Sequence, residues 1–282
     1  MSPVAPPAAA SAAPSVALSL EGKVALITGG SRGIGAACVR LFRQAGARVA
    51  FNYRSARDAA QALAADCGGP ASCAAFAQDL SSPEDGRSLV RRTVAAFGRL
   101  DILVANHGIW EPQEVSVASL SDAQWRNTLA INLDSVFGLV QSAVAQMQQQ
   151  LSTPTPHAVP AGHSKGEIVL ISSTAGQRGE AFHADYAASK GAIISMTKGL
   201  ATELAPQGIR VNCVAPGWVD TDMSAPALGD PLHRDRFVSL IPLRRPADPL
   251  EIAGPILFLC TPLAGFMTGE IVNVNGGAVL AG

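Results

Sequence analysis

Tyr186 and Lys190 are the two side chains whose types and spacing best suit proton transfer. On a helix, residues four positions apart share one face, with their Cβ atoms about 5–6 Å apart. A phenol, with a reference pKa of about 10, is a poor acid or base at neutral pH, and a fixed ammonium beside it favours the phenolate. A surface lysine and a half-buried tyrosine on an alanine-rich helix would show the same spacing, so the surrounding elements must decide between the two interpretations.

A glycine-rich turn near the start of the chain has the setting of a nucleotide site. The apolar run Lys23–Thr28 predicts a buried strand, and the amphipathic stretch that reaches Gly46 predicts a helix. Glycine lets the backbone approach a pyrophosphate, and a helix N-terminus offers free N–H groups and a positive dipole. A tight turn without a ligand would also use glycine, but with both flanking elements we expect a dinucleotide site here. Its residues are Gly29, Ser31, Arg32, Gly33, Ile34 and Gly35.

The end of the second expected strand, Ala47–Tyr53, should contact the adenine ribose. An acid at this position would bind the 2′-hydroxyl of NAD, but the sequence reads Tyr53, Arg54, Ser55. Arg54 and Arg32 suit a 2′-phosphate instead, because a guanidinium binds phosphate in bidentate fashion. The sequence therefore predicts NADP(H) as the cofactor. The alternative is a pair of solvated surface arginines.

Strands and helices alternate along the rest of the chain. Further strands are expected at Ser72–Gln78, Asp101–Ala105, Glu167–Ser172, Ile209–Ala215 and Ile271–Val274. Helices are expected at Pro83–Phe97, Ala123–Gln150, Asp185–Ala205 and Pro249–Cys260. This alternation predicts a single doubly wound, Rossmann-type α/β domain over residues 19–282, with a mostly parallel sheet of about seven strands. Ligands bind beyond the carboxyl ends of such strands, where Ser173 follows the fifth one.

Three segments fall outside this alternation. The uncharged, Pro- and Ala-rich residues 1–18 predict a disordered tail, because their prolines interrupt the apolar stretch that a signal peptide needs. Residues 151–165 predict a loop longer than usual. Residues 221–241 contain several prolines and predict an irregular segment that could act as a lid.

Composition excludes several classes of function. The 282 residues carry a net charge of −1, which argues against nucleic acid or an anionic membrane as a partner, and no apolar run is expected to span a bilayer. The five cysteines have mostly apolar neighbours and no Cys-x-x-Cys spacing, which favours a reducing, cytoplasmic location. The five histidines are scattered, so no metal site is expected.

Taken together, these motifs resemble the short-chain dehydrogenase/reductase family over roughly residues 20–282. Thr28–Gly35 matches the cofactor turn of the family, and Asp79-Leu80 matches the segment at the adenine edge. Ala105–Gly108 is similar to the Asn-Asn-Ala-Gly turn, with Asn106 and Gly108 retained and departures at the first and third positions. The family's catalytic tetrad is matched by Asn132, Ser173, Tyr186 and Lys190, and its nicotinamide-binding segment by Pro216, Gly217, Val219 and Thr221.

The resemblance implies a role for each member of the tetrad. Tyr186 would protonate the carbonyl oxygen of a substrate, and Ser173 would hydrogen-bond the same oxygen. Lys190 would lower the pKa of Tyr186 and bind the nicotinamide ribose. Asn132 would interrupt its helix and hold a water that relays protons to Lys190, although a helix-interior Asn bonded to backbone is the alternative. Ser172 competes with Ser173 for its role, but only Ser173 has the family's spacing of thirteen to the tyrosine.

Within the family the chain is most similar to reductases related to 3-oxoacyl-(acyl-carrier-protein) reductase, as Asn52–Ser55 and Pro216–Met223 indicate. The resemblance also implies a homotetramer, formed through the helices Ala123–Gln150 and Asp185–Ala205 and through the last strand region. Three functions compete: an NADPH-dependent carbonyl reductase, an NAD-linked alcohol or sugar dehydrogenase, and a dinucleotide sensor without activity.

Several further residues are candidates for the substrate pocket, with packing in the core or at its rim as the alternative. They are Trp110, Phe182, His183, Trp218 and Met223. His107 would lie near the nicotinamide by resemblance and could simply fill space. Asp185 is expected to cap the helix that carries Tyr186. The substrate itself is not predicted by any of these residues.

Overall fold

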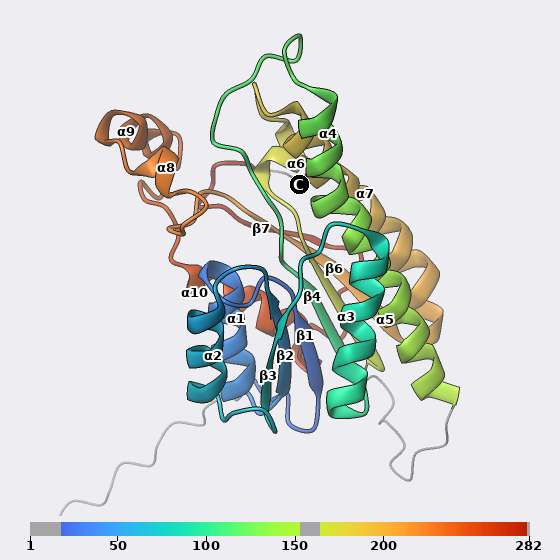
Figure 1. Ribbon diagram of the computed structural model, residues 1–282. Helices are drawn as coiled ribbons and strands as arrows, with labels where there is room; N and C mark the ends of the chain where they lie inside the picture. Colours follow the sequence, from blue (N-terminus) through green and yellow to red (C-terminus); the bar gives the residue numbers. More distant parts are fainter. Residues whose placement is uncertain (1–17, 153–163, 281–282) are drawn as a thin grey trace, which may run out of the picture.

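A single parallel sheet organises the computed structural model, which describes residues 18–152 and 164–280 (Figure 1). Its strands are β1 (Val24–Ile27), β2 (Arg48–Tyr53), β3 (Cys73–Ala77), β4 (Ile102–Ala105), β5 (Gly166–Ile171), β6 (Ile209–Pro216) and β7 (Ile271–Val274). The spatial order is β3-β2-β1-β4-β5-β6-β7, and every neighbouring pair is parallel. The chain therefore reverses its winding direction between β1 and β4, which is where doubly wound folds bind their ligands.

Helices cover both faces of this sheet (Figure 1). They are α1 (Gly33–Gln44), α2 (Arg57–Asp66), α3 (Pro83–Phe97), α4 (Asp122–Leu129), α5 (Ser135–Ser152), α6 (Thr174–Arg178), α7 (Ala184–Leu204), α8 (Ala225–Leu228), α9 (Pro231–Ser239) and α10 (Pro249–Leu259). Short 3₁₀ turns follow α7 at Ala205–Gln207 and α10 at Pro262–Ala264.

The core has two layers because successive strand residues point to opposite faces. On one face, Ala25 and Ile27 of β1 pack with buried residues of α1 and α10 such as Phe42 and Ile256. On the other, Val24 and Leu26 pack with residues of α3, α5 and α7. All four residues of β1 are fully buried, as expected for a strand covered on both sides. The expectation of one doubly wound parallel sheet of about seven strands is confirmed.

Two expectations about helices need correction. Residues 221–241 are not irregular throughout, because they contain α8 and α9. Two of the prolines that suggested irregularity, Pro226 and Pro231, stand in the first turns of these helices, where a missing N–H costs nothing. The helix expected at Ala123–Gln150 is not uniformly α-helical, since a π turn at Ala130–Asp134 separates α4 from α5. The expected tail and most of the expected 151–165 loop lie outside the described residues.

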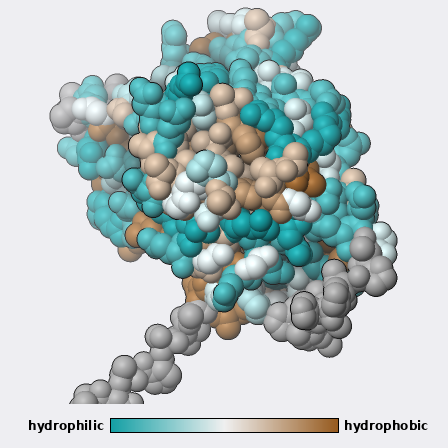
Figure 2. Space-filling model, turned by 60° about the horizontal axis from the view of Figure 1, so that its bottom comes forward, coloured by the Kyte–Doolittle hydropathy of each residue, from teal (hydrophilic) through white to brown (hydrophobic). Residues whose placement is uncertain are grey.

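The continuous helix Asp122–Ser152 is the one described helix whose length and mean hydropathy, 1.3, would allow it to cross a membrane, contrary to the sequence-based expectation that no segment would. Half of its apolar window is buried inside the protein, where α5 packs against α3. Its apolar character thus has an explanation within the fold. Seen with its lower side turned forward, the surface is largely hydrophilic, with apolar residues near the centre of this face and in smaller areas at its margins (Figure 2).

Candidate active site

The residues singled out for chemistry lie beyond the carboxyl ends of four neighbouring strands. The glycine turn follows β1, Asn106 follows β4, Ser173 follows β5, and Gly217 follows β6 (Figure 1). Because these strands are adjacent and parallel, their carboxyl ends meet at one edge of the sheet.

The glycine turn is built to receive a phosphate. Gly33 has φ +51° and begins α1, and a Cβ at this position would lie 3.1 Å from the methyl group of Thr221. Arg32, the N-cap residue of α1, makes no side-chain cap hydrogen bond, and the first turn of the helix contains no acid. The first N–H groups of α1 are therefore left for an anion, so the turn fits a dinucleotide pyrophosphate. The same packing brings the Thr221 segment against the turn.

Asn52 holds the turn in place, a role that the sequence analysis missed. Its side chain is 4% exposed and lies on β2. The amide oxygen accepts a hydrogen bond from the N–H of Gly29 at 2.9 Å, and the amide nitrogen donates to the carbonyl of Gln78 at 2.9 Å. Asn52 thus joins the turn after β1 to the end of β3. Its place near the end of β2, one residue before Tyr53, could have indicated that it lies close to the glycine turn.

Thr28 joins the turns that follow β1 and β4. Its hydroxyl oxygen accepts hydrogen bonds from the backbone N–H groups of Asn106, at 2.9 Å, and His107, at 3.1 Å. The side chain of Asn106 donates to the carbonyl of Thr28 at 3.0 Å. The two turns are therefore one rigid unit at the reversal point of the sheet.

His107 extends this unit to the long helix. Its Nδ1 lies 2.8 Å from the Thr28 hydroxyl, and its Nε2 lies 2.7 Å from the Ser135 hydroxyl. Since Ser135 donates its own proton to the carbonyl of Ile131, at 2.8 Å, it must accept from Nε2–H. Burial, reinforced by the charge of Lys190, lowers the pKa of His107 to about 3, so the ring is neutral. His107 does more than fill space, because it bridges two segments 79 and 28 residues away from it.

Asn132 occupies the π turn and is fully buried. Its amide oxygen accepts from the N–H of Ile109 at 2.8 Å, and its amide nitrogen donates to the carbonyl of Ile109 at 2.9 Å and to the Ser189 hydroxyl at 3.1 Å. The helix is thus interrupted at this residue, as the resemblance implied. The side chain bonds to another loop rather than to its own helix. π turns of this kind often occur at functional sites.

Gly108 allows this loop to pass close to two tetrad residues. A Cβ at Gly108 would lie 3.1 Å from the Asn132 amide oxygen and 3.3 Å from the Lys190 ammonium. A Cβ at this position would therefore force Asn132 or Lys190 to shift by a few tenths of an ångström. Glycine lets the loop pass without this shift.

The two neighbouring serines have different partners. Ser172 is 3% exposed, and its hydroxyl donates to the carbonyl of Lys190 at 2.8 Å, which fixes β5 to α7. Ser173 caps α6 by accepting from the N–H of Ala175 at 3.1 Å, and its side chain also forms a hydrogen bond with Tyr186. Of the two serines, Ser173 is the one that reaches the phenol.

The ionisation of Tyr186 and Lys190 differs from the sequence-based expectation. Burial raises the pKa of Tyr186 to about 12, although the hydrogen bond from Ser173 acts in the opposite direction. Burial also lowers the pKa of Lys190 to about 8. The Lys190 ammonium lies 5.9 Å from the centre of the Tyr186 ring and donates to the carbonyl of Ile171 at 2.9 Å. Burial is thus the main cause of both pKa shifts, and the phenol is protonated at neutral pH.

Aromatic rings from several loops gather beside Tyr186. Trp110 stacks on His183, with ring centres 5.0 Å apart, and meets Trp218 edge to face at 5.8 Å. Trp218 in turn packs on Phe237 of α9 at 4.6 Å. The loops after β4, β5 and β6 are thereby connected to one another. Phe182 and Met223 stand apart as exposed side chains, at 53% and 45%.

Asp185 does not cap α7, which corrects the sequence-based expectation. The N-cap residue is His183, and Asp185 lies in the first turn, where it is 3% exposed. Its carboxylate accepts from the Thr128 hydroxyl at 2.7 Å and from the Gln124 amide at 3.3 Å. These two hydrogen bonds fasten α7 to α4. The position of Asp185 in the first turn is also favourable because the helix dipole stabilises an acid there.

The charged residues expected at the adenine end of the cofactor are on the surface, whereas Tyr53 is buried. Arg32 and Arg54 are both exposed, and Arg32 forms an ion pair with Asp222 at 3.3 Å. Tyr53 is 8% exposed, and Asp79 is exposed at the end of β3. These side chains lie at the carboxyl ends of β1 to β3, at the edge where the turn begins.

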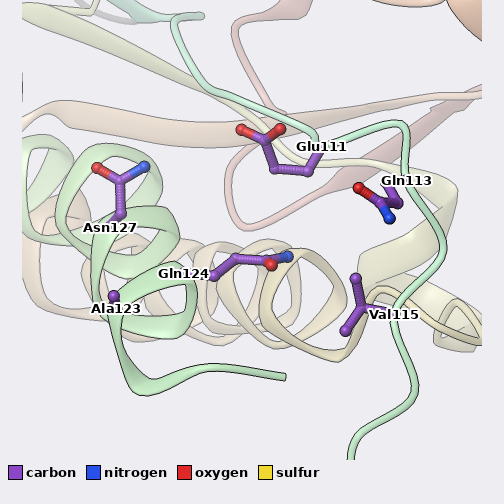
Figure 3. A pocket seen from close by; sticks show the side chains of 6 residues that line it. All are labelled: Glu111, Gln113, Val115, Ala123, Gln124 and Asn127. Carbon is purple, nitrogen blue, oxygen red and sulfur yellow. The ribbon is translucent and has the colours of Figure 1, made fainter. Parts of the chain in front are cut away.

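An open pocket of about 340 Å³ lies nearby and contains none of the tetrad (Figure 3). Its lining comes from the loop after β4 and from α4, and consists of Glu111, Gln113, Val115, Ala123, Gln124 and Asn127. Glu111 is its only titratable group, so we place the reactive centre at Tyr186 instead. Within the described residues, no three His, Cys, Asp or Glu side chains are grouped as metal ligands.

Comparison with known proteins identifies relatives over nearly the whole chain. The family described as enoyl-(acyl carrier protein) reductase matches residues 29–279. The 3-oxoacyl-(acyl-carrier-protein) reductase of Vibrio cholerae is 35% identical, covering 92% of this chain and 98% of its own.

Solved structures agree with this relationship. A short-chain dehydrogenase/reductase of Brucella melitensis, titled glucose/ribitol dehydrogenase, is 37% identical with a TM-score of 0.81, over 93% of this chain and 98% of its own. A short-chain dehydrogenase of Burkholderia cenocepacia, solved in complex with NADP, is 34% identical with a TM-score of 0.80, over 92% of this chain and 98% of its own.

Proposed function

The chain belongs to the short-chain dehydrogenase/reductase family and is an NAD(P)-dependent oxidoreductase, and from this premise we propose that it reduces a ketone to a secondary alcohol with NADPH. The catalytic groups in this proposal are Asn132, Ser173, Tyr186 and Lys190. The single observation that carries it is the position of Tyr186 beside Lys190, whose ammonium lies 5.9 Å from the centre of the Tyr186 ring and is hydrogen-bonded to the last residue of β5.

Reduction and oxidation would use Tyr186 in opposite protonation states. As a carbonyl is reduced, negative charge develops on its oxygen, and an acid within hydrogen-bond reach can neutralise it. Burial holds Tyr186 as the phenol, which is the form that reduction needs at its start. Proton transfer at neutral pH also requires the pKa of Tyr186 to fall toward the working pH, which is the role proposed for Lys190.

The proposed roles follow from the contacts of each side chain. Bound NADPH supplies the hydride. Tyr186 donates a proton to the carbonyl oxygen, and Ser173 positions that oxygen through its hydroxyl. Lys190 is buried beneath the loop at Gly108 and is placed to return a proton toward Tyr186. Asn132, held by Ile109 and Ser189, supports the site beside Lys190.

The cofactor residues are also part of the proposal. The pyrophosphate would lie on the turn from Gly29 to Gly35, and the nicotinamide end on the segment from Pro216 to Thr221, which packs against that turn. Arg32 and Arg54 would bind the 2′-phosphate. The NADP complex of the Burkholderia cenocepacia relative supports this choice.

A second candidate is an NAD-linked sugar or alcohol dehydrogenase. The observation in its favour is the ion pair between Arg32 and Asp222, which engages one of the two arginines meant for the phosphate. Both side chains are more than 60% exposed, so this pair is weak and a phosphate can displace it.

We also propose a cytoplasmic homotetramer. All five cysteines are free thiols, in keeping with a reducing compartment. Large apolar side chains are exposed on α5, at Phe137, and after α10, at Leu263 and Phe266. A subunit neighbour would remove them from water. Light scattering at micromolar concentration tests this, and a monomer mass would contradict it.

The proposed activity is tested by following absorbance of NADPH and NADH with a panel of 3-oxoacyl thioesters, cyclic ketones and keto-sugars. We expect reduction of at least one ketone, with NADPH preferred. Turnover with NAD and alcohols alone would favour the second candidate. Binding of NADPH without turnover of any carbonyl would favour a sensor.

A further inference from the structure

His183 has one ring nitrogen without a partner, beside the proposed reactive centre. The residue is 5% exposed, and Nδ1 lies 3.1 Å from the carbonyl of Ala181 and 3.7 Å from the Glu180 carboxylate. Nε2 is buried and has no hydrogen-bond partner among the residues that the structure describes. Buried polar atoms of this kind are rare in folded proteins and usually indicate a missing partner.

The surroundings of Nδ1 determine what Nε2 offers. A carbonyl and a carboxylate only accept hydrogen bonds, so Nδ1 must carry a proton. Nε2 then presents a lone pair in the neutral ring and an N–H in the protonated ring. A hydroxyl group satisfies it in either state, because a hydroxyl both donates and accepts.

The position of His183 places its unpaired Nε2 near the proposed substrate site. His183 is the N-cap residue of α7 and precedes Tyr186 by three residues, so it lies next to the turn that carries the phenol. Trp110 stacks on its ring with an interplanar angle of 24°, and Trp218 stands against Trp110. Flat aromatic walls with one polar atom suit a ring compound that carries few polar groups.

The segment that carries His183 has a strained backbone. Phe182 has φ +65°, a region that aromatic residues rarely adopt, and its side chain is 53% exposed. Gly179, four residues before His183, also has positive φ. Strained residues of this kind cluster at ligand-binding sites, and access of a ligand to the buried Nε2 through a shift of this segment is part of the proposal.

We infer that the substrate is a hydroxylated cyclic ketone, whose hydroxyl binds Nε2 of His183 while its ring lies against Trp110. The inference rests on the proposed reductase function and narrows its substrate class. A site built to bind a hydroxyl discriminates strongly against an analogue without one, because the buried nitrogen is then left unpaired.

The test compares cyclohexanone with its 2-, 3- and 4-hydroxy derivatives, using NADPH. We expect kcat/KM for at least one hydroxyketone to exceed that for cyclohexanone about 10- to 100-fold. His183→Phe retains a flat ring for Trp110 and should bring this ratio close to one. His183→Gln supplies another acceptor and donor and should restore much of it. Lys198→Gln, on the exposed surface of α7, is the control and should leave the ratio unchanged.

The outcomes separate the two proposals. If wild type reduces all these ketones equally, or if His183→Phe lowers every rate by the same factor, the inference is wrong and the reductase function stands. If no ketone is reduced, the reductase function fails, and calorimetry still decides the inference. Binding of a cyclohexanediol at least tenfold tighter than cyclohexanol, lost in His183→Phe, supports it, and equal binding overturns it.

Discussion

The proposed reaction centre and the proposed ribose end of the cofactor site hold their polar groups in opposite ways. Asn132 and Lys190 are 0% and 5% exposed, with every contact supplied by neighbouring backbone or side chains. Arg32 and Arg54 are exposed, and the only described partner of the Arg32 side chain is the equally exposed Asp222. Burial strengthens electrostatic interactions and protects them from salt, whereas exposed charges are screened. The chemistry is thus preorganised, while the choice of cofactor depends on the surface.

Among changes at these two sites, removal of the Tyr186 hydroxyl should lower the reaction rate most. Tyr186→Phe is expected to lower kcat by about 10²–10⁴-fold, because general acid catalysis contributes that much. Steady-state rates with the best ketone measure the loss. Thermal unfolding and NADPH fluorescence titration should show an intact fold and cofactor site. Turnover near the wild-type rate would remove Tyr186 from the mechanism.

At the ribose end, Arg54→Ala should reduce the preference for NADPH over NADH by about 10- to 100-fold, the value of one charged bidentate contact. The effect should shrink at high salt, unlike that of Tyr186→Phe. Arg57→Ala, a nearby exposed arginine at the start of α2, serves as the control. If Arg32 and Arg54 can both be removed without a change in the kcat/KM ratio, the arginines do not bind the phosphate.

The buried centre should also show a pH effect on stability through His107. Its pKa falls from 6.5 to about 3 on folding, so below pH 6.5 the unfolded chain binds a proton that the folded chain does not. The free energy of unfolding should therefore fall by up to about 1.4 kcal/mol per pH unit as the pH decreases from 6.5 toward 3.

Comparison with the His107→Gln variant isolates the contribution of His107 to this pH dependence. Burial raises the pKa of Glu167 to about 7, which stabilises the fold as pH falls and partly hides the histidine effect. Both proteins share Glu167, so the difference between their urea unfolding curves at pH 7 and pH 5 contains His107 alone. Equal dependence on pH in the two proteins would show that His107 titrates normally in the folded state.

The smallest effect is expected from the exposed ion pair. Asp222→Asn should release Arg32 and lower the KM for NADPH about two- to fivefold, with little change for NADH. Kinetics at low salt provide the measurement. A rise in the KM for NADPH would mean that Asp222 positions Arg32 rather than competing for it.

The sequence predicted best those elements whose limits are local. Helix α3 begins and ends as expected, at Pro83 and Phe97, because Ser82 caps it, proline suits its first turn and Gly98 takes φ +78° at its end. The helices within residues 221–241 were missed, since their prolines look the same whether they open a helix or prevent one. Asp185 was misassigned because its partners, Thr128 and Gln124, are about sixty residues away.

The site shows the same limit. Spacing and resemblance brought the tetrad together, but the ionisation of Tyr186 depends on burial, which no short motif encodes. The bridging role of His107 depends on Ser135, a residue with no recognisable pattern of its own. Long-range contacts of this kind arise only once the sheet has placed its strand ends side by side.

The π turn at Ala130–Asp134 makes the long helix sensitive to a change in length. A π turn holds one residue more than an α turn, so deleting one residue here would return the backbone to regular i→i+4 hydrogen bonds. Asn132 would then lose the widened turn from which its side chain bonds to Ile109. Relatives that retain this chemistry should therefore carry no insertion or deletion within this turn.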